Sequence, residues 1–171
     1  INHGPVKVFA DKVDNFEKFD KYSNAEIERF GGIKLLRKYR KANRVTEYIK
    51  LNQNVRSIFF DHWKSIEKIN LEIIKNIPTF CLIHSKEINH PNGSALNKRV
   101  IKSLKKTKFI IANSNFTKNL GIGIGLPKEK IHVIHPGCDE TINIDSELQR
   151  QAEEIFENSF PKILTVARLE K

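Results

Sequence analysis

The hydrophobic and polar positions of this chain follow two alternating patterns. Short apolar runs indicate buried strands, and the stretches between them repeat apolar residues every three or four positions, as amphipathic helices do. The pattern predicts strands over residues 6–10, 57–60, 79–84, 108–112, 131–134 and 162–167. It predicts helices over residues 33–51, 63–75, 95–106, 113–120 and 145–158. This alternation predicts a Rossmann-like α/β fold with a mainly parallel, doubly wound sheet flanked by helices.

Polar side chains follow three of the predicted strands. Parallel sheets bind their ligands at the carboxyl ends of the strands, so these side chains are candidates for a substrate cleft. They are Asp61, His62, His84, Glu87, Asn113 and Ser114. His84 is the best catalytic candidate, with Glu87 three residues beyond it. Simple roles stay open for all of them, because His84 can be satisfied by a carbonyl group and Asn113 and Ser114 are good helix caps.

Three closely spaced glycines, Gly121, Gly123 and Gly125, suggest a phosphate-binding loop at first sight. Such a loop follows a strand and opens a helix, so that the helical amides meet the anion. These glycines instead follow a predicted helix, and we expect them to form its C-terminal cap and a turn.

The sequence predicts neither a metal nor a cofactor. His84 and Glu87 supply only two ligands, and the other histidines show no ligand spacing around them. An Asp-x-Asp motif does not occur in the sequence.

The composition is that of a globular domain, with 171 residues, 39% hydrophobic and 29% charged. The apolar runs are too short to span a bilayer, and the first residues do not resemble a secretory signal. Cys81 and Cys138 are isolated and fit reduced thiols. These features predict a cytoplasmic protein.

The formal net charge of +10 predicts an anionic partner, either a phosphorylated ligand, a nucleic acid or an acidic membrane. Basic residues form stripes on two predicted helices, although such stripes are also common on solvated helix faces. The stripe residues are Lys34, Arg37, Lys41 and Arg44 on the first helix and Lys98, Lys102 and Lys105 on the second.

Four segments resemble one enzyme family. FIIANSNFTKNL (109–120) and GLPKEKIHVIHPGCD (125–139) are similar to the end of the N-terminal domain of retaining family 4 glycosyltransferases. The segments IHSKE (83–87) and ILTVARLEK (163–171) are similar to two further motifs of that family. The resemblance implies a GT-B architecture, in which two Rossmann-like domains face each other, the first meeting the acceptor and the second binding a nucleotide-sugar donor.

The resemblance also implies roles for individual residues. His84 matches a histidine near the transferred sugar, which stabilises developing charge. Arg168 matches an arginine that binds the diphosphate of the donor, a cation that replaces a metal. Lys118 lies at a frequently basic position without a firm role. Ser85 replaces the usual glycine after the histidine, and Lys171 is too close to Arg168 to match the family's partner lysine.

By this resemblance the chain is a truncated half of the fold. Residues 1–140 form the acceptor-side domain without its first strand and glycine-rich loop, residues 141–161 form a linker and a helix, and residues 162–171 begin the donor-binding domain. The parent enzyme is expected to transfer a hexose with retention and without a metal, whereas this fragment alone should be inactive. Peripheral contact with anionic lipid at the inner membrane face is a further expectation.

Two alternatives come from other functional classes. A basic α/β module could bind nucleic acid, but the aromatic residues are scattered and the sequence has no nucleic-acid-binding motif that we recognise. A glycosyltransferase-like domain without catalytic activity is the second alternative. The sequence does not separate such a domain from an active one.

Overall fold

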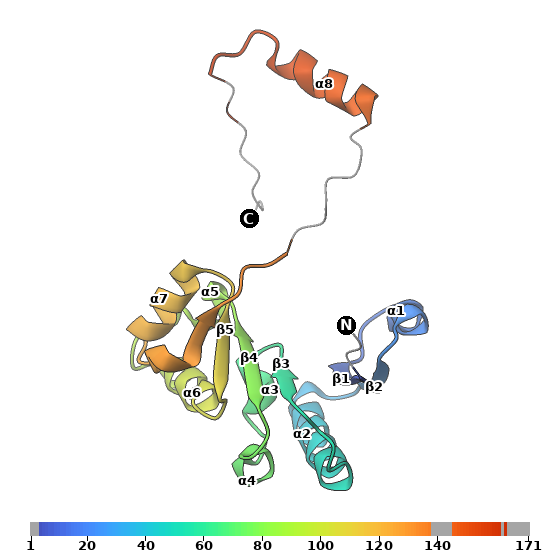
Figure 1. Cartoon of the computed structure of the whole chain (residues 1–171), viewed down its shortest axis with the longest axis vertical. Helices are drawn as coiled ribbons and strands as arrows, with labels where there is room; N and C mark the ends of the chain where they lie inside the picture. The colour runs from blue at the N-terminus through green and yellow to red at the C-terminus, as the bar shows by residue number, and fades with distance from the viewer. Residues whose placement is uncertain (1–3, 138–144, 162, 164–171) are drawn as a thin grey trace. The chain divides into compact units, whose positions relative to one another are not determined.

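The computed structural model describes residues 4–137, 145–161 and 163. The chain divides into two compact units, Ile1–Pro136 and Gly137–Lys171 (Figure 1). In the second unit, the described residues include helix α8 (Ser146–Phe156). Asp145 is its N-cap, and the Asp145 carboxylate accepts a hydrogen bond from the Glu147 amide. The predicted strand over residues 162–167 lies outside the described residues.

The first unit consists of parallel strands and the helices that connect them. Its strands are β1 (Lys7–Asp11), β2 (Glu26–Phe30), β3 (Ile58–Phe60), β4 (Thr79–Ile83), β5 (Phe109–Ala112) and β6 (Ile131–Val133). Its helices are α1 (Phe16–Tyr22), α2 (Lys34–Leu51), α3 (Trp63–Ile66), α4 (Leu71–Ile74), α5 (Ser85–Ile88), α6 (Ala95–Leu104), α7 (Asn115–Gly123) and the 3-10 turn η1 (Lys128–Lys130). Strands β1 and β2 form one parallel pair, and β3, β4, β5 and β6 form a second parallel sheet in chain order. The predicted α/β fold is confirmed, with its strands divided between two sheets.

The core lies on one face of the four-stranded sheet. Alternate side chains of the strands are buried there against α3 and α6, as the two-residue period of a strand requires. Trp63 of α3 and Leu104 of α6 are at most 1% exposed. Burial of one such side chain contributes about 1.5–3 kcal/mol. The strand residues of this core are Phe60, Cys81, Ile83, Ile110, Ala112 and Ile131.

The opposite face of this sheet has a row of stacked aromatic rings. The ring centroids of Phe59 and Phe80 are 4.7 Å apart, and those of Phe80 and Phe109 are 4.9 Å apart. Phe59 is 68% exposed, so the described residues leave this end of the row open to solvent. The two neighbours Phe59 and Phe60 thus lie on opposite faces, one exposed and one in the core.

Strand β2 and helix α1 were not predicted from the sequence. The sequence of β2, EIERF, has few apolar residues, and its charged side chains are satisfied by neighbouring elements. Lys7 of β1 contacts Glu26 at 2.5 Å and Glu28 at 3.3 Å. Arg29 contacts Asp20 of α1 at 2.5 Å. These ion pairs allow a charged strand to pair along its whole length with β1.

The helix predicted over residues 63–75 is wrong, because two short helices, α3 and α4, replace it. Asn70 lies between them with an extended backbone, and its side-chain oxygen accepts a hydrogen bond from the Glu72 amide. Asparagine is among the best N-cap residues, so it begins a new helix here. Ile69, just before the cap, is 3% exposed and belongs to the core.

The three glycines form a helix end, as the sequence predicts. Helix α7 ends at Gly123, and the Gly125 amide donates to the Ile122 carbonyl oxygen. Gly125 has a φ of +91°, a left-handed conformation that favours glycine. Gly121 is buried inside the helix, where an added Cβ would lie 3.1 Å from Ile131 Cδ1. The predicted helix end and turn are therefore confirmed at Gly123 and Gly125, whereas Gly121 lies inside the helix instead of after it.

The basic stripe of α2 is largely neutralised within the fold. Arg37 and Lys41 contact the Asp11 carboxylate at 3.2 and 2.8 Å, and Arg44 contacts Glu28 at 3.0 Å. The stripe therefore joins α2 to β1 and β2 instead of forming a free cationic surface. Among the described residues, no helix is long and apolar enough to cross a membrane.

Candidate functional site

The candidate residues lie at the carboxyl ends of three neighbouring strands. Asp61 and His62 follow β3, His84 follows β4, and Asn113 follows β5. Because β3, β4 and β5 are adjacent and parallel, their ends meet at one edge of the sheet. The structure thus brings together residues that are up to 52 positions apart, as between Asp61 and Asn113.

His84 is linked to the end of β5 by its ring. The Nδ2 atom of Asn113 lies 3.2 Å from Nδ1 of His84. His84 occupies the N-cap position of α5, but its side chain makes no cap hydrogen bond and is exposed. The ring is therefore held by Asn113 and is accessible to a ligand.

Thr117 fixes the orientation of the Asn113 amide. Its Oγ1 donates to Asn113 Oδ1 at 2.7 Å and accepts from Ser114 Oγ at 3.1 Å. With Oδ1 accepting from Thr117, the amide directs its NH2 group to His84, whose Nδ1 then accepts. A neutral ring that accepts at Nδ1 has its proton at Nε2. The hydrogen bonds favour a His84 that is a donor at Nε2.

Sequence reasoning missed Thr117. It is 1% exposed, and a buried hydroxyl in a helix of apolar spacing gives no functional signal. A signal existed in its spacing, because Thr117 follows Ser114 by three positions and Asn113 by four. These are the spacings at which side chains on a helix meet. Ser114 also caps α7, since its hydroxyl accepts from the Thr117 amide at 3.1 Å.

His62 and Glu87 face each other beside this cluster. Nε2 of His62 lies 3.9 Å from Oε1 of Glu87, and Nδ1 of His62 accepts from the Lys64 amide at 3.0 Å as the cap of α3. Burial lowers the pKa of His62, outweighing the nearby Glu87 carboxylate, which raises it.

Glu87 has an unsatisfied carboxylate oxygen. Its Oε2 is buried and has no hydrogen-bond partner in the described residues. Buried polar atoms are nearly always satisfied, so such an oxygen indicates a place where a ligand or water donates. Cys81 lies in the core beneath, and burial raises the pKa of its thiol, with Asp61 and Glu87 adding to the effect.

Within the described residues, the structure does not join the predicted site residues Asp61 and Lys118 to the cluster around His84. Asp61 accepts a hydrogen bond from Ser65 Oγ at 2.8 Å, which gives it a structural role at the start of α3. Lys118 lies on α7, and within the described residues no hydrogen bond or ion pair joins its side chain to the cluster. Arg168 lies outside the described residues, so its predicted role stays a prediction.

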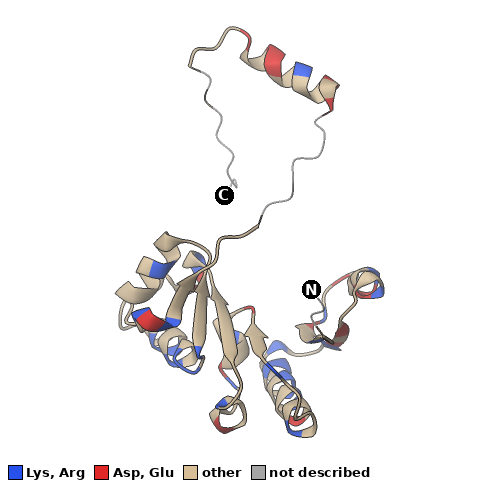
Figure 2. Ribbon diagram, viewed as in Figure 1, with Lys and Arg blue, Asp and Glu red and all other residues tan. Residues whose placement is uncertain are grey.

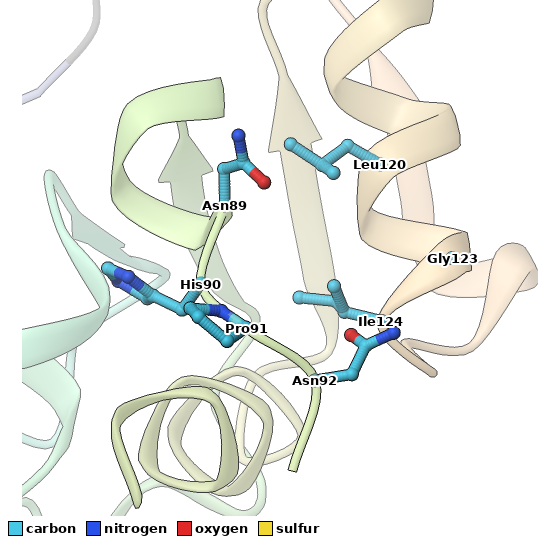
Figure 3. Close-up of a pocket in the computed structure, with 7 residues that line it drawn as sticks. All are labelled: Asn89, His90, Pro91, Asn92, Leu120, Gly123 and Ile124. Carbon is cyan, nitrogen blue, oxygen red and sulfur yellow. The ribbon is translucent and has the colours of Figure 1, made fainter. Parts of the chain in front are cut away.

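A hollow of about 500 Å³ lies between the end of α5 and α7 (Figure 3). Figure 3 shows the Asn89 side chain directed toward Leu120, whereas the His90 ring points away. Neither His84 nor Glu87 lines this hollow. Among described residues, no group of three or more His, Cys, Asp or Glu side chains is arranged to hold a metal ion.

The architecture is that of a known class of enzymes. Among solved structures the chain is similar to Anabaena Alr3699/HepE, crystallised in complex with UDP. The TM-score is 0.60 at 14% sequence identity, and the match covers 88% of this chain and 50% of HepE. At this identity the likeness shows the fold, which is that of a GT-B glycosyltransferase. The chain spans half the length of that protein.

The sequence itself gives the family. The model of Glycosyltransferase Family 4 matches residues 4–141. The chain therefore belongs to Glycosyltransferase Family 4, and the resemblance seen in its motifs is confirmed. A search of curated proteins finds no significant match.

Proposed function

We propose that this chain is the acceptor-side part of an enzyme that transfers a hexose from a nucleotide sugar with retention of the anomeric configuration. Support comes from the family, from the fold it shares with HepE, and from the polar cluster at the strand ends. UDP is bound by HepE, which makes a nucleotide-sugar donor the natural candidate here.

The contact between Asn113 and His84 is the observation that supports this function most directly. It holds the His84 ring at the carboxyl end of β4 and favours the tautomer with a donor at Nε2. In our proposal, this N–H donates to an oxygen of the transferred sugar and stabilises charge as the glycosidic bond breaks. A donor held in place before the reaction loses little free energy to reorganisation.

Glu87 and His62 form the second part of the proposed site. The unsatisfied Oε2 of Glu87 would accept a hydrogen bond from a sugar hydroxyl or from an ordered water. Nε2 of His62 lies 3.9 Å from Oε1 of Glu87. Because its lowered pKa favours the neutral ring, His62 does not form an ion pair with Glu87. The pair would orient the sugar instead of exchanging protons with it.

The donor diphosphate would be bound by cations and without a metal. This part of the proposal depends on Arg168, by family resemblance, and on the lack of an Asp-x-Asp motif in the sequence. A guanidinium binds two phosphate oxygens at once and stabilises the leaving group. Because donors bind the second domain of this architecture, we expect the chain alone to be inactive.

Peripheral contact with anionic lipid is a separate part of the proposal, and it now depends on α6 alone. Lys98, Lys102 and Lys105 are exposed, and no described carboxylate pairs with them. A co-sedimentation assay with vesicles should show binding that needs acidic lipid and weakens with salt. Equal binding to neutral and acidic vesicles would remove this part.

Glycosyl transfer is tested with the full-length gene product. We expect turnover or slow donor hydrolysis with at least one member of a panel of nucleotide sugars, and a product with the anomeric configuration of the donor. NMR of the product gives that configuration. A folded protein without turnover on any donor would favour a non-catalytic domain.

A further inference from the structure

A basic hollow of about 180 Å³ lies between α6 and the connection from α3 to α4. It is at the sheet edge opposite the His84 cluster, because Lys106 precedes β5 whereas Asn113 follows it. Figure 2 shows the concentration of Lys and Arg on α6. The residues that line the hollow are Glu67, Lys68, Arg99, Lys102, Ser103 and Lys106.

The positive charge of this hollow is not neutralised. Arg99 occupies both oxygens of Glu67, at 2.7 and 3.1 Å. Lys68, Lys102 and Lys106 then have no carboxylate partner among the described residues. Three ammonium groups around one hollow repel one another, and a bound anion would relieve that repulsion.

Lys106 is held in place at the base of the hollow. Its Nζ donates to the backbone carbonyl oxygens of Glu67 and Ile69 at 3.0 and 3.3 Å. An ammonium has three N–H donors, so one remains for a ligand. Burial and the neighbouring Lys102 lower the pKa of Lys106. Carbonyl groups thus orient this cation without cancelling its charge.

Ser103 adds a neutral donor to the same hollow. The residue is 2% exposed, and its hydroxyl has no hydrogen-bond partner within the described part of the chain. Its hydroxyl lines the hollow and is therefore available to donate to a ligand there. Ammonium groups and a hydroxyl together match the several acceptor oxygens of a phosphoryl group.

We propose that the hollow between α6 and the α3–α4 connection binds a phosphoryl group. At about 30 Å³ for each water molecule, its 180 Å³ holds roughly six waters, which suits one phosphoryl group better than a whole nucleotide. The phosphoryl group belongs either to a soluble phosphate compound or to a lipid head group. This site is independent of the proposed glycosyl transfer.

The test is a titration of the full chain with inorganic phosphate, followed by amide NMR at constant ionic strength. We expect saturable shifts at Ser103 and Lys106. In the double variant Lys68→Gln/Lys102→Gln, affinity should fall by roughly tenfold, since each lysine contributes a partly screened ionic contact. Both side chains are exposed, so the fold should persist, which thermal unfolding can verify.

The control is the double variant Lys98→Gln/Lys105→Gln, which makes the same change in net charge on and just after α6 but outside the hollow. It should bind phosphate as the wild type does. Equal loss in both double variants, or shifts that never saturate, would overturn the proposal, because either result means a diffuse attraction to net charge.

A second arm separates the two sources. Vesicles that contain phosphatidic acid are compared with phosphatidylcholine vesicles, with and without competing inorganic phosphate. Lipid binding that the Lys68→Gln/Lys102→Gln variant loses and the Lys98→Gln/Lys105→Gln variant keeps assigns the site to a head group, whereas equal loss in both variants assigns the lipid binding to the diffuse charge of α6. Phosphate binding without lipid binding assigns it to a soluble compound, and binding of neither overturns the site.

Discussion

Asn113 and His84 lie 29 positions apart in the sequence, and their side chains meet with Nδ2 of Asn113 3.2 Å from Nδ1 of His84. The contact joins the ends of β4 and β5, and Thr117 supports it from α7. The orientation of the proposed catalytic ring therefore depends on a buried hydroxyl that contacts neither the ring nor a ligand.

Replacement of Thr117 by valine should loosen this arrangement. The variant leaves Asn113 Oδ1 without its 2.7 Å donor and costs about 1–3 kcal/mol of stability. We also expect the amide to lose its fixed orientation, so that His84 populates both neutral tautomers. Nitrogen chemical shifts of the His84 ring measure the tautomer ratio.

The matched control is Thr117→Ser, which keeps the hydroxyl and should keep His84 protonated at Nε2. A tautomer ratio that is the same in the wild type and in Thr117→Val would exclude Thr117 as a positioning residue. Loss of stability without a tautomer change would leave it a purely structural role.

His62 should make stability depend on pH. Burial holds the pKa of His62 below the ordinary value of 6.5 in the folded protein. The unfolded chain then takes up a proton that the folded chain resists, so the free energy of unfolding falls as the pH drops below about 6.5. His62→Asn keeps a cap acceptor for α3 and removes this titration.

Urea unfolding of both proteins at about pH 7.5 and 5.5, on either side of the ordinary histidine pKa, checks this prediction. The wild type should lose more stability than His62→Asn between the two pH values. Equal losses would show that His62 titrates alike in the folded and unfolded chains.

Alanine substitutions of the two glycines at the end of α7, Gly123 and Gly125, should change the stability in opposite directions. Gly125 has a φ of +91°, so Gly125→Ala should destabilise by about 1–2 kcal/mol. An added Cβ at Gly123 meets no atom within 4 Å, and Gly123→Ala should stabilise the helix by about 0.5–1 kcal/mol. Thermal unfolding measures both, and destabilisation of similar size in both variants would contradict the helix-end geometry.

Two neighbouring phenylalanines test which face of the sheet holds the core. Phe60 is 6% exposed, so Phe60→Ala should cost about 3–5 kcal/mol. Phe59 is 68% exposed and stacks on Phe80, so Phe59→Ala should cost only about 0.5–1.5 kcal/mol. Similar losses from denaturant unfolding would mean that both faces of β3 are covered.

The sequence predicts the parts of this fold whose patterns are local. The apolar runs of β3, β4 and β5 locate the strands, and the rule that ligands bind at strand ends selects His84, Glu87 and Asn113. All three lie at one edge of the sheet. Their side-chain contacts depend on strand order, which a hydrophobic pattern does not encode.

The features that the sequence does not predict also depend on contacts between side chains. Strand β2 is charged, and its ion pairs with Lys7 of β1 and Arg44 of α2 satisfy charges that a hydrophobic pattern reads as solvent-exposed. The break before α4 depends on the helix cap at Asn70. The apolar residues on both sides of Asn70 keep a helical spacing, so the hydrophobic pattern predicts one continuous helix there. The spacing of Thr117 predicts contact with Asn113 and Ser114, but its role depends on the hydrogen bond from Asn113 to His84, which only the strand order brings about.

The most direct test of the proposed function compares His84→Ala with His132→Asn in the full-length gene product. Both histidines are exposed, but the His132 ring packs against Phe109, on the face of the sheet opposite the core. With a nucleotide sugar that supports turnover, we expect kcat of His84→Ala to fall by about 10²–10³-fold with little change in donor affinity, because a transition-state donor is lost. His132→Asn should retain the wild-type kcat. A folded His84→Ala protein with wild-type kcat would contradict the account, because the ring held by Asn113 would then have no part in the transfer.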